Sequence, residues 1–254
     1  MHERKLLSLF ALSLSVCLSL GMCVVATRLA KASGAPPNAA ATSAANLKGT
    51  VRFEGVVPKP KVISMTADPS CAKQHSSPVF AQDVLTDSKG DLQNVIVFVA
   101  DGLGDRTFDP PTQPAVVEQK GCMYMPHVLA VRANQPLHVV NDDPTSHNIH
   151  PTPANNREWN KAEPPGSSMD ESFAREEIAI PVKCNLHPWM HGYIAVFKHP
   201  YFAVTGKDGT FDLSSLPPGT YTIKAWHEKL GTSTQTITIG ANETKEISFV
   251  FKGM

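Results

Sequence analysis

The sequence has no excess of charge of either sign, with 23 Lys plus Arg residues against 23 Asp plus Glu residues. Proteins that bind nucleic acid or anionic membrane surfaces usually carry a clustered basic excess, so this balance gives no reason to expect such partners. Long amphipathic helical patterns are also missing, while 21 prolines and 16 glycines interrupt the chain. Frequent turns of this kind favour short strands, and we therefore expect an all-β protein.

One long hydrophobic run stands out, and it lies at the N-terminus. Two basic residues precede the run, which covers residues 6–26, and Ala30 and Ala32 then offer the small side chains that a signal peptidase reads. The pattern predicts a signal peptide over residues 1–32, a periplasmic or secreted protein, and no membrane span after cleavage. The run could also cross about 30 Å of hydrocarbon, so an uncleaved anchor is the alternative. Residues 33–46, rich in Ala and Ser, predict a flexible linker.

Cysteine is scarce in the exported chain, which retains Cys71, Cys122 and Cys184. Thiols tend to pair in an oxidising compartment, and an odd number leaves at least one with another role. Because Cys184 lies among histidines, the simplest partition is a Cys71–Cys122 disulfide with Cys184 held as a thiolate by a metal. A different pairing and an intermolecular bridge both remain open.

Strand patterns dominate the rest of the sequence. Short β-branched or alternating runs are bounded by turn residues such as Asp208-Gly209 and Pro218-Gly219. One stretch, Met169 to Glu177, is weakly helical. The strands are expected at residues 50–54, 62–65, 95–99, 116–117, 128–131, 137–140, 178–182, 193–197, 203–205, 210–213, 221–226, 234–239 and 246–251.

The segment from Cys184 to Met190 places a thiolate, the imidazole of His187 and a thioether within seven residues. Copper that cycles between Cu(I) and Cu(II) suits this mixture, because thiolate and thioether hold the reduced form and imidazole suits both. A blue-copper site takes two histidines, one cysteine and a long axial methionine. The missing histidine should come from a distant strand, and we expect His147 to supply it.

Other interpretations of these residues are possible. Cys-x2-His could be half of a structural zinc site, although such a site usually needs further cysteines. A lone methionine is more often a core residue than a ligand. His150 and His191 adjoin the expected ligands and could replace them. The remaining histidines are expected to be ordinary surface or core residues: His75, His127, His138, His199 and His227.

Residues 114–198 resemble the cupredoxins, and the spacing Cys-x2-His-x2-Met is similar to the ligand loop of the amicyanins. Pro after the histidine and an aromatic residue before the methionine extend the likeness. The resemblance carries the copper ligands onto His147, Cys184, His187 and Met190. It also implies one type 1 copper ion, single-electron transfer and redox partner proteins.

The same resemblance assigns further roles. Asn148 matches an asparagine that ties the two ligand loops together. His187 matches a ligand whose ring edge is usually exposed, which predicts an electron exit there. Trp189 is then either a docking residue or a residue packed in the seam between the two domains. Two departures are a long polar stretch at 152–179 and the lack of an aromatic residue at Val182.

A second resemblance covers the C-terminal part of the chain. Residues 205–221 are similar to the carboxypeptidase regulatory-like, or transthyretin-like, β-sandwich, and we assign residues 199–254 to it. Residues 47–113 supply N-terminal strands that we expect to belong to the same sandwich, with the copper domain inserted. The predicted fold is a cupredoxin-like Greek-key sandwich plus a small transthyretin-like β-sandwich. The combination resembles bacterial methylamine-utilisation-type proteins.

The expected function is that of an electron carrier and not of an enzyme, because four protein ligands leave no open position for substrate. The alternatives are a copper-handling or ligand-binding module and, less favoured, a copper-dependent enzyme.

Overall fold

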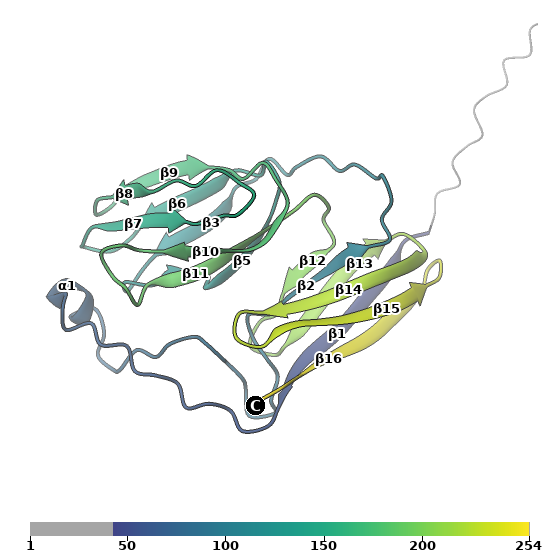
Figure 1. Cartoon of the computed structure of the whole chain (residues 1–254), viewed down its shortest axis with the longest axis horizontal. Helices are drawn as coiled ribbons and strands as arrows, with labels where there is room; N and C mark the ends of the chain where they lie inside the picture. Colours follow the sequence, from purple (N-terminus) through teal and green to yellow (C-terminus); the bar gives the residue numbers. More distant parts are fainter. Residues whose placement is uncertain (1–42, 254) are drawn as a thin grey trace, which may run out of the picture. The chain divides into compact units, whose positions relative to one another are not determined.

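The computed structural model describes residues 43–253, shown with the N-terminal trace in Figure 1. The predicted signal peptide and most of the predicted linker lie outside the described residues. Within the described part, no helix is long and apolar enough to cross a membrane. This part is all-β as predicted, apart from one helical turn, α1 (Pro69–Ala72).

One β-sandwich consists of a three-stranded sheet, in the order β13-β1-β16, and a four-stranded sheet, in the order β12-β2-β14-β15. We refer to it as the regulatory-like sandwich. Its two N-terminal strands are separated from the other five by about a hundred residues of intervening sequence. The strands are β1 (Ala45–Glu54), β2 (Ile96–Asp101), β12 (Phe202–Val204), β13 (Thr210–Leu216), β14 (Gly219–His227), β15 (Gly231–Ile239) and β16 (Thr244–Lys252).

The intervening strands form a second sandwich, which we call the copper sandwich because it carries the four copper ligands predicted from the sequence. Its sheets have the orders β5-β11-β10-β7-β8 and β4-β3-β6-β9. Two of its strand pairs, β3 with β6 and β5 with β11, are parallel. The strands are β3 (Ala115–Gln119), β4 (Tyr124–Met125), β5 (Val128–Arg132), β6 (Leu137–Asn141), β7 (His147–Pro151), β8 (Lys161–Glu163), β9 (Ser168–Glu171), β10 (Glu177–Lys183) and β11 (His191–Phe197).

The continuous apolar run of β2 has a structural reason. Val97 and Val99 point into the core of the regulatory-like sandwich, while Ile96 and Phe98 lie in another buried cluster with Ala195 and other residues of the copper sandwich. A strand covered on both faces must be apolar at successive positions, because alternate side chains point to opposite faces.

The segment between β1 and β2, residues 56–91, forms a strap with little regular structure. It carries α1, whose N-cap is Asp68: the carboxylate accepts hydrogen bonds from the backbone N–H groups of Ser70 and Cys71. A disulfide joins Cys71 to Cys122, so the expected pairing is confirmed. The strap is thereby fixed to the loop between β3 and β4 of the copper sandwich.

The helical tendency expected from Met169 to Glu177 is wrong. Met169 lies in β9, which pairs antiparallel with β6, and Glu177 begins β10. The carboxylate of Glu177 accepts hydrogen bonds from three backbone N–H groups, those of residues 154–156. A nine-residue stretch has little helical stability of its own, so pairing with a sheet edge overrides a weak local preference.

Candidate metal centre

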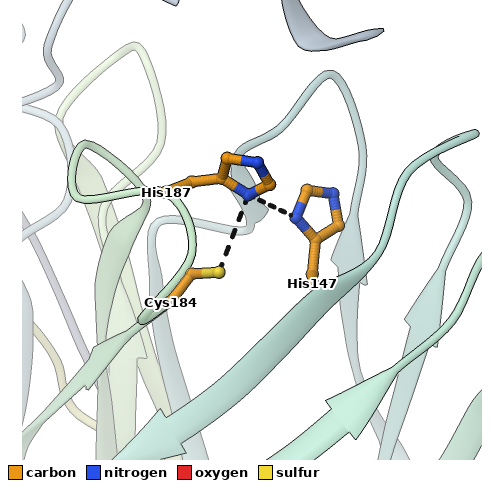
Figure 2. Close-up of side chains that lie close together, drawn as sticks. All are labelled: His147, Cys184 and His187. Atoms are coloured by element: carbon orange, nitrogen blue, oxygen red, sulfur yellow. Dashed lines mark hydrogen bonds between the residues drawn. The ribbon is translucent and has the colours of Figure 1, made fainter. Parts of the chain in front are cut away.

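Three of the four predicted ligands converge in one buried cluster (Figure 2). His147 begins β7, Cys184 follows β10, and His187 lies in the loop before β11. The two Nδ1 atoms of His147 and His187 lie 2.9 Å apart, and Nδ1 of His187 is 3.7 Å from Sγ of Cys184. Their exposed fractions are only 1–4%. Two imidazole nitrogens and a thiolate sulfur therefore face a common, water-excluded point.

Met190 is fully buried and packs in the same hydrophobic cluster as Cys184. The loop places it there by two backbone hydrogen bonds. The N–H of Met190 donates to the carbonyl of His187 at 2.9 Å, and the N–H of Cys184 donates to the carbonyl of Met190 at 3.0 Å. This tight turn holds the thioether-bearing residue beside the other two members of the motif.

Asn148 links the two ligand-bearing segments, as the family resemblance predicted. Its Oδ1 accepts a hydrogen bond from the backbone N–H of Asn185 at 2.7 Å and lies 3.4 Å from the sulfur of Cys184. Its own side-chain N–H donates to Asn160 at 2.7 Å. The amide thus fixes the distance between β7 and the Cys184 loop.

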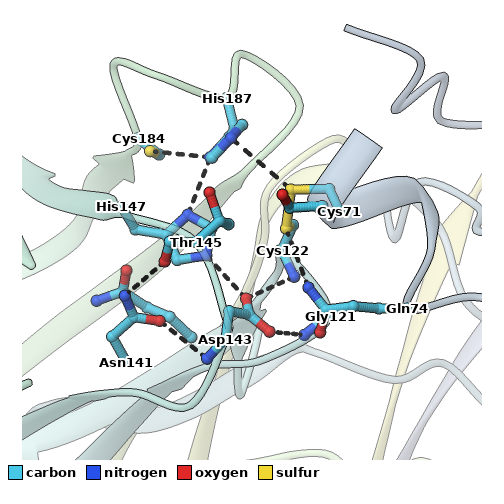
Figure 3. A network of polar contacts seen from close by, with 12 residues as sticks. Cys71, Gln74, Gly121, Cys122, Asn141, Asp143, Thr145, His147, Cys184 and His187 are labelled. Atoms are coloured by element: carbon cyan, nitrogen blue, oxygen red, sulfur yellow. Dashed lines mark hydrogen bonds and ion pairs between the residues drawn. A yellow bond between two sulfur atoms is a disulfide. The ribbon is translucent and has the colours of Figure 1, made fainter. Parts of the chain in front are cut away.

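Each imidazole contacts a carboxylate through its Nε2 atom. Nε2 of His147 lies 2.8 Å from Oδ2 of Asp143 (Figure 3). Nε2 of His187 lies 2.9 Å from Oδ2 of Asp68. Asp143 is itself held by the backbone N–H groups of Gly121 and Cys122. A carboxylate that accepts from Nε2–H leaves the lone pair on Nδ1, which is the arrangement of a metal-bound histidine.

In the cluster the thiol of Cys184 is favoured in the state that a metal requires, whereas His147 would have to release a proton when a metal binds. Burial opposes ionisation of the Cys184 thiol, but hydrogen bonds from His147 and the neighbouring backbone outweigh it and lower the pKa to about 6. Burial likewise opposes the charge on His147, yet the hydrogen bond to Asp143 and the nearby thiolate raise its pKa to about 9. The pKa of Asp68 is lowered chiefly by its hydrogen bond from His187. The thiolate that a metal requires is therefore favoured near neutral pH.

The expected exposure of His187 is wrong, because this residue is only 4% exposed. The strap covers it: besides Asp68, the sulfur of Cys71 lies 3.7 Å from Nε2 of His187. The exposed apolar residue of the ligand loop is instead Leu186, at 59%.

Trp189 is half-buried and does not pack in the seam between the two sandwiches. It packs against two buried hydrophobic clusters, one in the core of the copper sandwich and one around the Cys71–Cys122 disulfide. Its Nε1–H donates a hydrogen bond to the carbonyl of Cys122 at 3.2 Å. Its ring centroid is 5.1 Å from that of His187. Trp189 therefore links the ligand loop to the disulfide.

The alternative ligands lie elsewhere. His150 contacts Asn185 and Glu158, and His191 belongs to a separate cluster with His127 and Glu228. Since Cys71 and Cys122 form a disulfide, Cys184 is the one free cysteine in the described residues. A cysteine-rich zinc site is therefore ruled out in this part of the chain.

Sequence reasoning missed three acidic residues around the cluster. Asp143 could have been found, because it closes the Asn141-Asp142-Asp143 run before His147, but no signal pointed to Asp68. Glu163 lies opposite His147 in the β7–β8 pair, is 2% exposed and contacts Gln119. Burial raises the pKa of Glu163 to about 7.

Part of the chain is similar to several solved copper proteins. One is the copper-containing nitrite reductase from Thermus scotoductus SA-01, with 19% identity over 38% of this chain and 25% of that chain and a TM-score of 0.32. A second is a purple cupredoxin from Nitrosopumilus maritimus, with 22% identity over 32% of this chain and 98% of that chain and a TM-score of 0.29. A third is a point mutant of amicyanin in its Cu(I) form, with 16% identity over 39% of this chain and 97% of that chain and a TM-score of 0.30. The match thus spans only a quarter of the nitrite reductase.

Residues 194–252 match the family model of the carboxypeptidase regulatory-like domain. This range begins in β11 and includes all five C-terminal strands of the regulatory-like sandwich. No curated protein matches the chain by sequence.

Proposed function

We propose that this protein is a blue-copper electron carrier that acts outside the cytoplasm. One observation carries the proposal: Nδ1 of His147, Nδ1 of His187 and the sulfur of Cys184 converge in a buried site while both Nε2 atoms are occupied by carboxylates. With Met190 packed beside Cys184, this donor set fits copper that alternates between its two oxidation states.

The protein supplies a fixed, dry environment. Burial excludes water from the cluster, the carboxylates fix the histidine tautomers, and Asn148 fixes the position of the cysteine loop. A bound copper ion would supply the one-electron couple. Because the protein offers two imidazoles, a thiolate and a thioether, little room remains for a substrate at the metal, which favours electron transfer over catalysis.

Two features support a location outside the cytoplasm. The N-terminal hydrophobic pattern is typical of export, and the Cys71–Cys122 disulfide is typical of oxidising compartments. Soluble redox proteins are the partners that we propose, since the site has no open position for a small substrate.

The test is spectroscopic. Copper-loaded protein is expected to show an intense thiolate-to-Cu(II) charge-transfer band that disappears reversibly on reduction. Cys184→Ala should abolish the band, because it requires a Cu–S bond. His150→Ala is the matched control, since His150 adjoins the cluster without belonging to it, and it should keep the band. A coloured Cys184→Ala variant would contradict the ligand set, and release of copper on reduction would support copper handling instead.

A further inference from the structure

A second cluster of metal-binding side chains lies apart from the copper ligands. His127 precedes β5, His191 begins β11, and Glu228 lies in the turn between β14 and β15. One potential ligand atom from each residue lies within 4.8 Å of the others. The cluster therefore brings together residues of the copper sandwich and the regulatory-like sandwich, and it shares no ligand with the first site.

The carboxylate at the centre of this cluster is deeply buried. The side chains of His127 and Glu228 are 2% and 1% exposed, and Nε2 of His127 lies 2.5 Å from Oε1 of Glu228. Lys229 is 3.4 Å from Oε2 of Glu228, but it also pairs with Asp83 at 3.2 Å. Apart from the ion pair with Lys229, Oε2 of Glu228 has no hydrogen-bond partner, and Nδ1 of His127 has none. A buried polar group of this kind normally has a partner.

The orientation of His191 distinguishes a metal site from a simple buried ion pair. Its Nδ1 lies 3.0 Å from the carbonyl oxygen of Trp189, and a carbonyl can only accept, so Nδ1 carries the proton. This leaves the lone pair on Nε2, for which the described residues provide no hydrogen-bond donor. An ion pair between His127 and Glu228 gives this second imidazole no role, whereas a metal ion would use all three residues.

The donor set indicates the class of ion. Two imidazoles and one carboxylate without a thiolate are typical of Zn²⁺, which takes three protein ligands plus water. Zinc–ligand distances of about 2.0–2.1 Å require the donor atoms to lie about 3.3 Å apart, so the close His127–Glu228 contact would open slightly. We infer that His127, His191 and Glu228 form a zinc site that joins the two sandwiches.

The location predicts what a bound ion does. Glu228 is carried by the β14–β15 hairpin, whereas His191 immediately follows Met190 in the copper sandwich. Zinc would therefore restrain the regulatory-like hairpin against the strand that leaves the copper site. An ion that binds only the folded state also raises the stability of the protein with its concentration.

The experiment uses the full chain with its first site already filled by one equivalent of copper. Zn²⁺ uptake is measured by equilibrium dialysis with elemental analysis, and unfolding is followed with and without Zn²⁺. The wild type should bind one Zn²⁺ per chain and melt at a higher temperature in its presence. No zinc uptake by the copper-loaded wild type would overturn the inference, and the copper band reports separately on the first site.

Glu228→Gln keeps the shape of the side chain but removes its charge. It should weaken zinc binding by more than about 100-fold. Removal of a residue that only hydrogen-bonds to a metal ligand already costs up to about 100-fold in affinity, and Glu228 is itself a proposed ligand. His127→Asn should do the same. The matched control is His138→Asn, because His138 forms an imidazole–carboxylate pair with Asp170 at the surface, without a third ligand. Equal zinc uptake by wild type and Glu228→Gln would also overturn the inference.

Discussion

Nε2 of His187 lies 2.9 Å from Oδ2 of Asp68, a residue 119 positions earlier in the chain. This contact joins the ligand loop of the copper sandwich to the strap between the first two strands. The same strap residue caps α1, and the disulfide at Cys71 holds it in place. The second histidine of the site is thus enclosed by a segment of the chain that lies outside the cupredoxin-like sequence.

Asp68→Asn should raise the reduction potential. A negative charge next to a ligand favours Cu(II) over Cu(I). Its removal should change the ratio of the protein's affinities for Cu(II) and Cu(I) about tenfold, which corresponds to a change in potential of about 60 mV for one electron. Asparagine is also a good N-cap, so α1 should persist. Voltammetry of the copper-loaded protein measures the shift. Asp170→Asn, which removes a carboxylate from the remote His138, is the control, and equal potentials in both variants would contradict the role of Asp68.

Replacing both cysteines of the disulfide by serine should destabilise the protein and loosen the strap. Closing a loop of 51 residues is expected to contribute about 4 kcal/mol through the entropy of the unfolded chain. Denaturant unfolding of the Cys71→Ser/Cys122→Ser variant measures the loss. If the strap encloses His187, the potential of this variant should also move towards that of Asp68→Asn. An unchanged midpoint of unfolding would show that the disulfide is dispensable.

Met190→Gln should lower the reduction potential while copper stays bound. The axial ligand of a blue-copper site tunes the potential more than the affinity, and an amide oxygen favours Cu(II) more than a thioether does. A change of about 60 mV corresponds to a tenfold change in relative affinity. Met125, which is 48% exposed, provides the control variant Met125→Gln. Complete loss of copper from Met190→Gln would indicate a structural role instead.

Trp189→Ala should cost about 3 kcal/mol of stability, because a half-buried ring and its hydrogen bond to Cys122 are lost. Leu186→Ala is the matched control in the same loop. Its side chain is 59% exposed, so the change should alter stability by less than about 0.5 kcal/mol. Thermal unfolding and the rate of electron exchange separate the two roles. Normal stability with slow exchange in Trp189→Ala would favour a docking residue.

The folded protein should lose stability as the pH falls from about 6.5 to about 4. Burial lowers the pKa of His199 from 6.5 to about 4, and the positive charge of Arg132 adds to the effect. The unfolded chain therefore binds the proton in this range while the folded chain does not, which corresponds to roughly 3 kcal/mol. His199→Gln should flatten this part of the pH profile, and His138→Gln should not. Parallel profiles for wild type and His199→Gln would refute the assignment.

The sequence by itself determined the local parts of this protein. The all-β class follows from short runs between turn residues, and the Cys184–Met190 motif brings its members together within a single tight loop. The odd number of cysteines that follow the predicted signal peptide also pointed to the disulfide and to the free thiol of Cys184. These features depend on residues that are close in sequence or on simple counting.

Only the tertiary structure decided what surrounds the site. Asp68 reaches His187 because a disulfide fixes an irregular strap, and neither periodicity nor a local motif records such a contact. Met169 joined a strand because hydrogen bonds from a distant strand outweighed its local preference. Packing also brings together the cluster of His127, His191 and Glu228. The distances between these side chains depend on how the two sandwiches pack, and the spacing of the residues along the chain does not reveal them.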